Sequence, residues 1–176
     1  MSFYQQLEKV ASKFISKELL FKYGFNWSPM YRRSCAKIIS ISKNLLEIRI
    51  KLAYNYKNKN FVGSIFGGSM FAAVDPIPMI QLMQLLGDDY VVWDKSAEIY
   101  FKRPAREVLY ADFHFDSNEL EAIRKKVLEE KEIDIIKTTH LTNKNRNTVY
   151  CEVQKTIYIA DKVFYKKKKE LRKGST

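Results

Sequence analysis

Cysteine and histidine are both scarce in this sequence of 176 residues, and their scarcity excludes several classes of protein. The two cysteines, Cys35 and Cys151, cannot build a disulfide framework or a cysteine-rich zinc knuckle. The two histidines, His114 and His140, lie far apart in different segments, so we expect no metal site and no bound cofactor. The first residues contain no apolar run typical of a signal peptide, and together with the few cysteines this predicts a cytoplasmic protein.

Glycine and proline are also few, at six and four residues, which excludes collagen-like and linker-dominated chains. With 46% hydrophobic and 14% aromatic residues the chain can form a core, and its length suits one domain. We expect that domain to span residues 1–161, with a helix over 2–24 and the remaining elements over 35–160. Residues 162–176 are predicted to be a basic tail without apolar periodicity.

The net charge is +11, and its distribution bears on the partners to expect. Residues 161–176 hold seven Lys or Arg and two Asp or Glu, so nearly half of the excess charge lies in the tail. The moderately basic remainder suits polyanionic small molecules as readily as nucleic acid. Since the body carries no nucleic-acid-binding motif, we expect no nucleic-acid partner. The Lys run in the tail is either solvated or an electrostatic contact with a membrane surface.

One long apolar run, residues 61–87, has Asp75 as its sole ionisable residue. A central Asp costs roughly 3 kcal/mol in a membrane-spanning helix, and the amphipathic strands predicted on both sides are those of a soluble protein. We therefore predict no membrane span, but a helix over about 67–86 that is apolar on all faces and buried in a core. One sheet can cover only part of such a helix, so a homodimer or a dimer of dimers is expected.

Hydrophobic periodicity predicts the other elements. An N-terminal helix begins with a capping box at Ser2 and stops at Gly24. Alternating apolar residues indicate strands, and Ser117 is the predicted cap of a second amphipathic helix. The expected strands cover residues 36–41, 46–53, 91–101, 109–115, 133–141 and 149–159. Because most connections between strands are short, we predict an α+β domain with an antiparallel sheet of about six strands wrapped around the central helix.

This order of elements resembles the hotdog fold of acyl-CoA thioesterases, and the motif residues make the resemblance more specific. The segment 60–68, Asn-Phe-Val-Gly-Ser-Ile-Phe-Gly-Gly, followed by Asp75, is similar to the motif of phenylacetate-pathway hotdog thioesterases. That motif reads Asn-x-x-Gly-x-x-His-Gly-Gly and has an Asp seven residues after the second Gly. Phe66 stands where the family usually has His. The Phe-Gly-Gly variant, with Asp-Lys-Ser at 94–96 and Arg-Pro-Ala-Arg at 103–106, resembles a hotdog subgroup without an assigned substrate.

The resemblance implies roles for the motif residues, each with a structural alternative. Gly67 and Gly68 would present backbone amides to a developing oxyanion, or they would only permit tight packing at the start of the helix. Asp75 would be a general base or nucleophile, or the N-cap of a helix that begins at Pro76, and the two roles are compatible. Asn60 would orient a water or the thioester, or it is a turn residue.

Further substrate contacts are expected from residues around this motif. They are Gly63, Phe66, Asp94, Ser96, Arg103 and Arg106. An Arg suits the phosphates of coenzyme A, although a basic loop is often simply solvated. Lys95, on the predicted apolar face of its strand, either pairs with a carboxylate or extends to the sheet edge.

The sequence and its resemblance together predict a hydrolase that cleaves acyl-CoA-type thioesters, with coenzyme A thioester as substrate and not as cofactor. The alternative is a hotdog protein that binds acyl thioesters without turning them over.

Overall fold

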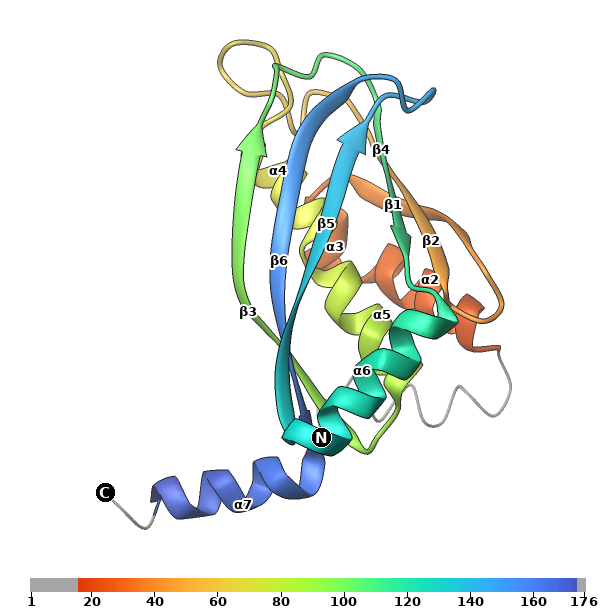
Figure 1. The fold of residues 1–176 in the computed structure, drawn as a ribbon. Helices are drawn as coiled ribbons and strands as arrows, with labels where there is room; N and C mark the ends of the chain where they lie inside the picture. Colours follow the sequence, from red (N-terminus) through yellow and green to blue (C-terminus); the bar gives the residue numbers. More distant parts are fainter. Residues whose placement is uncertain (1–15, 174–176) are drawn as a thin grey trace.

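A computed structural model describes residues 16–173 as a curved six-stranded antiparallel sheet with a long helix along one face (Figure 1). The strands are β1 Ala36–Ile41, β2 Glu47–Leu52, β3 Tyr90–Phe101, β4 Leu109–His114, β5 Glu132–Thr142 and β6 Val149–Asp161. Their spatial order is β1-β2-β4-β5-β6-β3, so β1 and β3 are the two edges. The predicted α+β class, strand number and antiparallel sheet are confirmed.

The central helix consists of two segments, α4 (Gly67–Val74) and α5 (Pro76–Leu86), separated by Asp75 alone. Its buried side chains join two apolar clusters. The first cluster contains Met70, Ala73, Val74 and Ile77 and packs towards β1, β2 and β4. The second contains Leu82 and Leu86 and packs towards β3 and β6. Within residues 16–173 it is the one helix long and apolar enough to cross a membrane, and 56% of its most apolar window is buried inside the molecule. It is therefore a core helix.

The sheet covers only part of this helix, as expected for a helix that is apolar on all faces. Phe71, Met79, Ile80 and Met83 are only half-buried. The fold of the single chain thus leaves an apolar stripe of the central helix partly open.

The N-terminal helix α2 spans Lys17–Trp27, and a short helix α3 (Pro29–Arg33) follows it. Gly24 was wrongly predicted to end the helix, because the stop comes at Ser28, just before Pro29. The Asn26 side chain bonds both the amide and the carbonyl of Ile38, at 2.8 and 3.0 Å, and so fastens α2 to the edge strand β1. The capping box expected at Ser2 lies outside the described residues.

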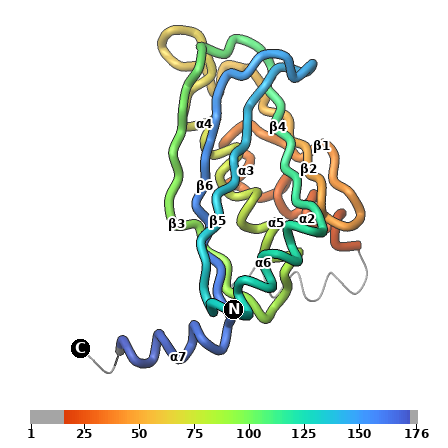
Figure 2. Tube along the Cα trace, in the orientation of Figure 1, coloured from red at the N-terminus to blue at the C-terminus, as the bar shows by residue number. Residues whose placement is uncertain are grey.

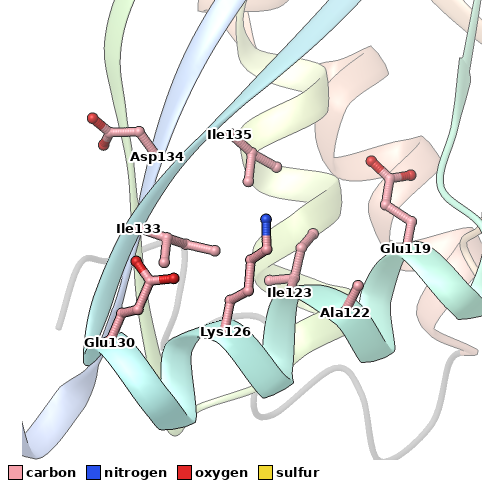
Figure 3. A pocket seen from close by; sticks show the side chains of 8 residues that line it. All are labelled: Glu119, Ala122, Ile123, Lys126, Glu130, Ile133, Asp134 and Ile135. Carbon is pink, nitrogen blue, oxygen red and sulfur yellow. The ribbon is translucent and has the colours of Figure 1, made fainter.

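Helix α6 (Ser117–Glu130) packs against β5 through Ile123 and closes the second apolar cluster. Its N-cap is Asp116, whose carboxylate accepts the Glu119 amide at 2.7 Å, so the predicted cap at Ser117 is wrong by one residue. A shallow cavity of about 320 Å³ lies between α6 and β5 (Figure 3). Lys126 and Glu130 line it from the helix, and Ile133 and Ile135 line it from the strand.

The predicted alternation of core-facing and outward-facing residues in β3 is correct only for the second half of the strand. The register with β6 shifts between Asp94 and Ser96, which is a β-bulge. Trp93, which lies two residues before Lys95 and so shares its predicted apolar face, is 56% exposed, whereas Val92 is buried. Because the extra residue reverses the alternation, Asp94 lies on the core side and Lys95 points outward, where its ammonium pairs with Asp134.

The segment expected to be a basic tail without apolar periodicity contains a helix, α7 (Lys162–Lys173). It follows β6 directly and projects sideways from one end of the molecule (Figures 1 and 2). Asp161 caps it by accepting the Phe164 amide at 2.8 Å.

Candidate active site

Asp75 lies at the junction of α4 and α5, and its side chain caps neither helix. Pro76 occupies the first position of α5, as predicted, yet Asp75 keeps a right-handed helical backbone with φ −45° and ψ −53°. A residue before Pro normally avoids this conformation. The predicted capping role is therefore wrong for the side chain of Asp75, which instead points to β6.

Lys155 of β6 is the partner of Asp75, and sequence reasoning missed it. Its ammonium lies 2.7 Å from Asp75 Oδ1, 2.7 Å from the Asp75 carbonyl oxygen and 2.6 Å from Asp94 Oδ2. The Lys155 side chain is 1% exposed, against 40% for Asp75. A buried ammonium is tolerated when carboxylates and carbonyls satisfy its protons. A signal was present, because Lys155 occupies the apolar phase of β6, in line with Val153 and Ile157.

Asp94 completes this cluster from β3. The bulge turns its side chain inward, so that one carboxylate oxygen binds Lys155 while Oδ1 is buried and has no partner among the described residues. Burial raises the pKa of Asp94, the Asp75 charge adds to the rise, and the bond to Lys155 opposes it. The carboxylates of Asp75 and Asp94 thus share the buried ammonium of Lys155, and Oδ1 of Asp94 accepts no hydrogen bond among the described residues.

The start of α4 presents two free backbone amides. The amides of Ser69 and Met70 already donate to the Phe66 carbonyl, at 2.9 and 3.2 Å. Within residues 16–173, those of Gly67 and Gly68 have no acceptor, as expected for the first turn of a helix. A developing negative charge is favoured at such a position by the amides and by the helix dipole.

Two aromatic rings lie directly against these glycines. A Cβ on Gly67 would come within 2.6 Å of the Phe101 ring of β3, and a Cβ on Gly68 would overlap the Phe66 ring. Both rings are more than half exposed, at 56% and 57%. The glycines therefore permit a close approach that any other residue would block.

The glycine amides and Asp75 lie far apart within one chain. Asp75 lies seven positions after Gly68 in the sequence, which corresponds to about 10 Å along the helix axis. A base acts at hydrogen-bond distance from its target. The two features are thus separate half-sites on the same helix.

The loop before α4 shows Asn60 as a turn residue. Its Oδ1 accepts the amides of Val62 and Ser64 at 3.1 and 3.0 Å, and its amide nitrogen donates to the Ser64 hydroxyl at 2.9 Å. Gly63 adopts a positive φ of 75°, and its carbonyl accepts the Tyr54 hydroxyl. Both residues shape the loop that leads to Phe66.

The basic loop after β3 packs beside this turn. The Ile65 amide donates to the Ala105 carbonyl at 2.8 Å, and the Arg106 guanidinium donates to the Val62 carbonyl at 3.3 Å. The fold thus brings Arg106 and the exposed Arg103 to the loop that begins α4. Ser96 is exposed on the edge strand and belongs to neither half-site.

Other features of the described residues do not form a competing site. The cavity beneath α6 lies on another part of the molecule, and its Glu119 and Asp134 pair with Lys137 and Lys95. In the described part of the chain, no three His, Cys, Asp or Glu side chains gather closely enough to hold a metal ion.

Comparisons with known proteins place this geometry in a family. The profile described as "Domain of unknown function (DUF4442)" matches residues 18–159. No curated protein matches the sequence.

Solved structures share the fold at low sequence identity. A probable thioesterase of unknown function from Pseudomonas aeruginosa aligns with a TM-score of 0.71 at 16% identity, covering 81% of this chain and 95% of its own. Zebrafish thioesterase superfamily member 2 aligns with a TM-score of 0.55 at 14% identity, covering 78% and 92%. A thioesterase from Haemophilus influenzae gives 0.52 at 11% identity, covering 92% of each chain. The chain belongs to the DUF4442 family, and its fold is the hotdog fold of thioesterase-superfamily proteins.

Proposed function

We propose that the protein hydrolyses acyl thioesters of the coenzyme A class. The observation that carries the proposal is the pairing of two half-sites on one central helix: free Gly67 and Gly68 amides at its start, and Asp75 held by a buried lysine at its kink. The names of the structural neighbours support the same reaction class. A cytoplasmic location remains the expectation from the sequence.

The chemistry follows from these groups. The thioester carbonyl binds with its oxygen towards the Gly67 and Gly68 amides, which stabilise the negative charge that develops there. Asp75 takes a proton from a water molecule, whose oxygen attacks the carbonyl carbon. The carbon–sulfur bond then breaks, and the thiol leaves with the proton. In the nucleophilic variant, Asp75 attacks first and water hydrolyses the resulting anhydride.

We propose that a complete site requires two copies of the chain. The half-sites of one chain are about 10 Å apart, so they cannot act on the same carbonyl. The outer edge of β3 is unpaired among the described residues, and the helix stripe around Met79 and Met83 is half-open. A dimer that continues the sheet through β3 would cover this apolar surface and bring the glycines of one copy towards Asp75 of the other.

Two groups of neighbouring residues receive supporting roles in this proposal. Lys155 positions the Asp75 carboxylate through the 2.7 Å contact of its ammonium with Oδ1. Arg103 and Arg106, beside the loop that begins α4, are suited to coenzyme A phosphates.

A second candidate function is binding of acyl thioesters without turnover. It is favoured by Phe66, which replaces a hydrogen-bonding side chain and packs its ring on Gly68. Phe66 and Phe101 would then hold an acyl or pantetheine chain over the glycines. The two candidates share the ligand and differ in the chemical step.

A panel of acyl-CoA thioesters assayed by release of free thiol tests the proposal. We expect turnover of at least one aliphatic or aromatic member, and this turnover should fall at least roughly a hundredfold in Asp75→Asn. Saturable binding of acyl-CoA without thiol release would support the binding module instead. Neither binding nor release across the panel would refute both candidates.

A further inference from the structure

We propose that helix α7 docks the protein on a membrane surface that carries anionic lipid. Its twelve residues, Lys162–Lys173, contain seven Lys or Arg and a single acidic residue, Glu170. This density of positive charge in one short helix is typical of segments that bind anionic headgroups. The proposal is independent of the thioesterase activity.

One side of α7 is fixed to the body of the protein. Tyr165 packs on Tyr158 of β6, with ring centroids 6.3 Å apart. The Lys168 ammonium binds both carboxylate oxygens of Glu132, at 2.5 and 2.6 Å. These contacts, with the cap at Asp161, hold the helix in a defined orientation.

The other sides of α7 combine exposed cations with exposed apolar side chains. Lys166, Lys167 and Lys169 are exposed, and so are Val163 at 62% and Leu171 at 74%. Val163, Lys167 and Leu171 follow one another at i, i+4 and i+8 and therefore share one line on the helix. A helix lying in a membrane interface has this mixture, because its apolar residues enter the acyl boundary and its lysines reach the headgroups.

This mixture favours lipid over nucleic acid. A nucleic-acid-binding surface uses cations for phosphates and polar or aromatic side chains for bases. Exposed Val163 and Leu171 serve neither purpose. The same two residues are too few to bury a stable protein interface, whereas partial insertion into a bilayer needs only a small apolar area.

The position of α7 lets docking and catalysis proceed together. The helix leaves the end of β6, and α4 begins towards the opposite end of the sheet (Figure 1). A membrane bound at α7 therefore leaves the glycine amides accessible to substrate.

The test is sedimentation of the full-length protein with phosphatidylcholine vesicles prepared with and without phosphatidylserine. Wild type is expected to sediment only with the anionic vesicles, and less so as salt is raised. The variant Lys166→Gln, Lys167→Gln and Lys169→Gln removes three charges and keeps good helix formers. Its partition coefficient should fall about a hundredfold, since each lysine near the surface contributes roughly a factor of five.

A matched control distinguishes the effect of the charges on α7 from the effect of the net charge of the protein. Lys43→Gln, Lys57→Gln and Lys144→Gln remove the same charge from exposed loops elsewhere, and should lower the partition coefficient far less. Equal losses in the two triple variants, or no sedimentation of wild type, would overturn the proposal. Salt-sensitive binding of duplex DNA, lost in the α7 variant while vesicles are ignored, would also overturn it. Turnover of a soluble short-chain acyl-CoA serves as a separate measurement, because it reports the proposed active site and not α7.

Discussion

At the scale of single residues, a substitution at Asp75 can distinguish a catalytic role from a structural one. Its side chain caps no helix, and Asn can still accept a hydrogen bond from Lys155. We therefore expect Asp75→Asn to unfold within a few degrees of wild type but to lose thioesterase activity by at least roughly a hundredfold. Thermal unfolding and the thiol-release assay measure the two effects. Full turnover in a well-folded variant would exclude Asp75 as base or nucleophile.

Lys155 is the residue on which we expect stability to depend most strongly. Lys155→Met leaves the Asp75 and Asp94 carboxylates beside each other without a cation, which should lower the free energy of unfolding by about 3–5 kcal/mol. Lys95→Met is the matched control, because its partner Asp134 is on the surface, and it should cost less than about 1 kcal/mol. Urea denaturation compares the two. Similar losses would mean that the buried cluster contributes no more than a surface ion pair.

The Asp94 cluster also predicts a pH dependence of stability. The pKa of Asp94 is raised in the folded protein, so between the ordinary value of 3.8 and the raised one the folded state retains a proton that the unfolded state has lost. Stability contributed by this residue therefore falls as pH rises through that window. Asp94→Asn lacks the titration, and its stability relative to wild type should increase across the window. Urea unfolding of both proteins at a series of pH values tests the sign, and a constant difference would contradict it.

At the scale of elements, the first turn of α4 can be tested without disturbing the fold. The added methyl in Gly68→Ala meets only the outer atoms of the Phe66 ring, which is exposed and can turn away. We expect a melting temperature close to that of wild type, because Ala also favours the helix. Thioesterase activity should fall strongly, since the displaced ring and the methyl obstruct access to the amides. Unchanged activity would show that the carbonyl does not bind there.

Elements were predictable from the sequence where alternation was regular, and less so where one extra residue changed it. The strands and the apolar helix all follow from hydrophobic periodicity. The bulge at Asp94 left no such signal, because both phases of β3 contain apolar residues. It reverses the orientation of Trp93 and Asp94, and the Asp94–Lys155 contact could therefore not be foreseen.

The candidate site was predictable only in part. The Gly67 and Gly68 position and Asp75 followed from the motif and from the apolar run around it. Lys155 interrupts an apolar alternation, which identifies it as unusual but does not reveal its partner 80 residues away. Helix α7 was missed because the lysine run hides the alignment of Val163 and Leu171, and because the cap at Asp161 belongs to the preceding strand.

At the scale of the whole molecule, the proposed dimer makes a prediction that no monomeric enzyme shares. If the glycines of one copy act with Asp75 of the other, a dimer of one Asp75→Asn chain and one Gly68→Ala chain has one intact site and one doubly defective site. After random exchange of subunits, about a quarter of wild-type activity should return from two inactive proteins, as the two-fold symmetry of a dimer requires. Thiol release is measured before and after mixing, under conditions that allow exchange.

The control is a mixture of Asp75→Asn with the double variant Asp75→Asn and Gly68→Ala, in which no intact site can form. It should stay inactive however long the subunits exchange. Sedimentation of the mixed proteins establishes whether dimers are present at the assay concentration. A monomer that turns over substrate would show that a single chain completes the site, despite the 10 Å or so of helix between its two halves. Dimers that exchange without recovering activity would place both halves in the same subunit.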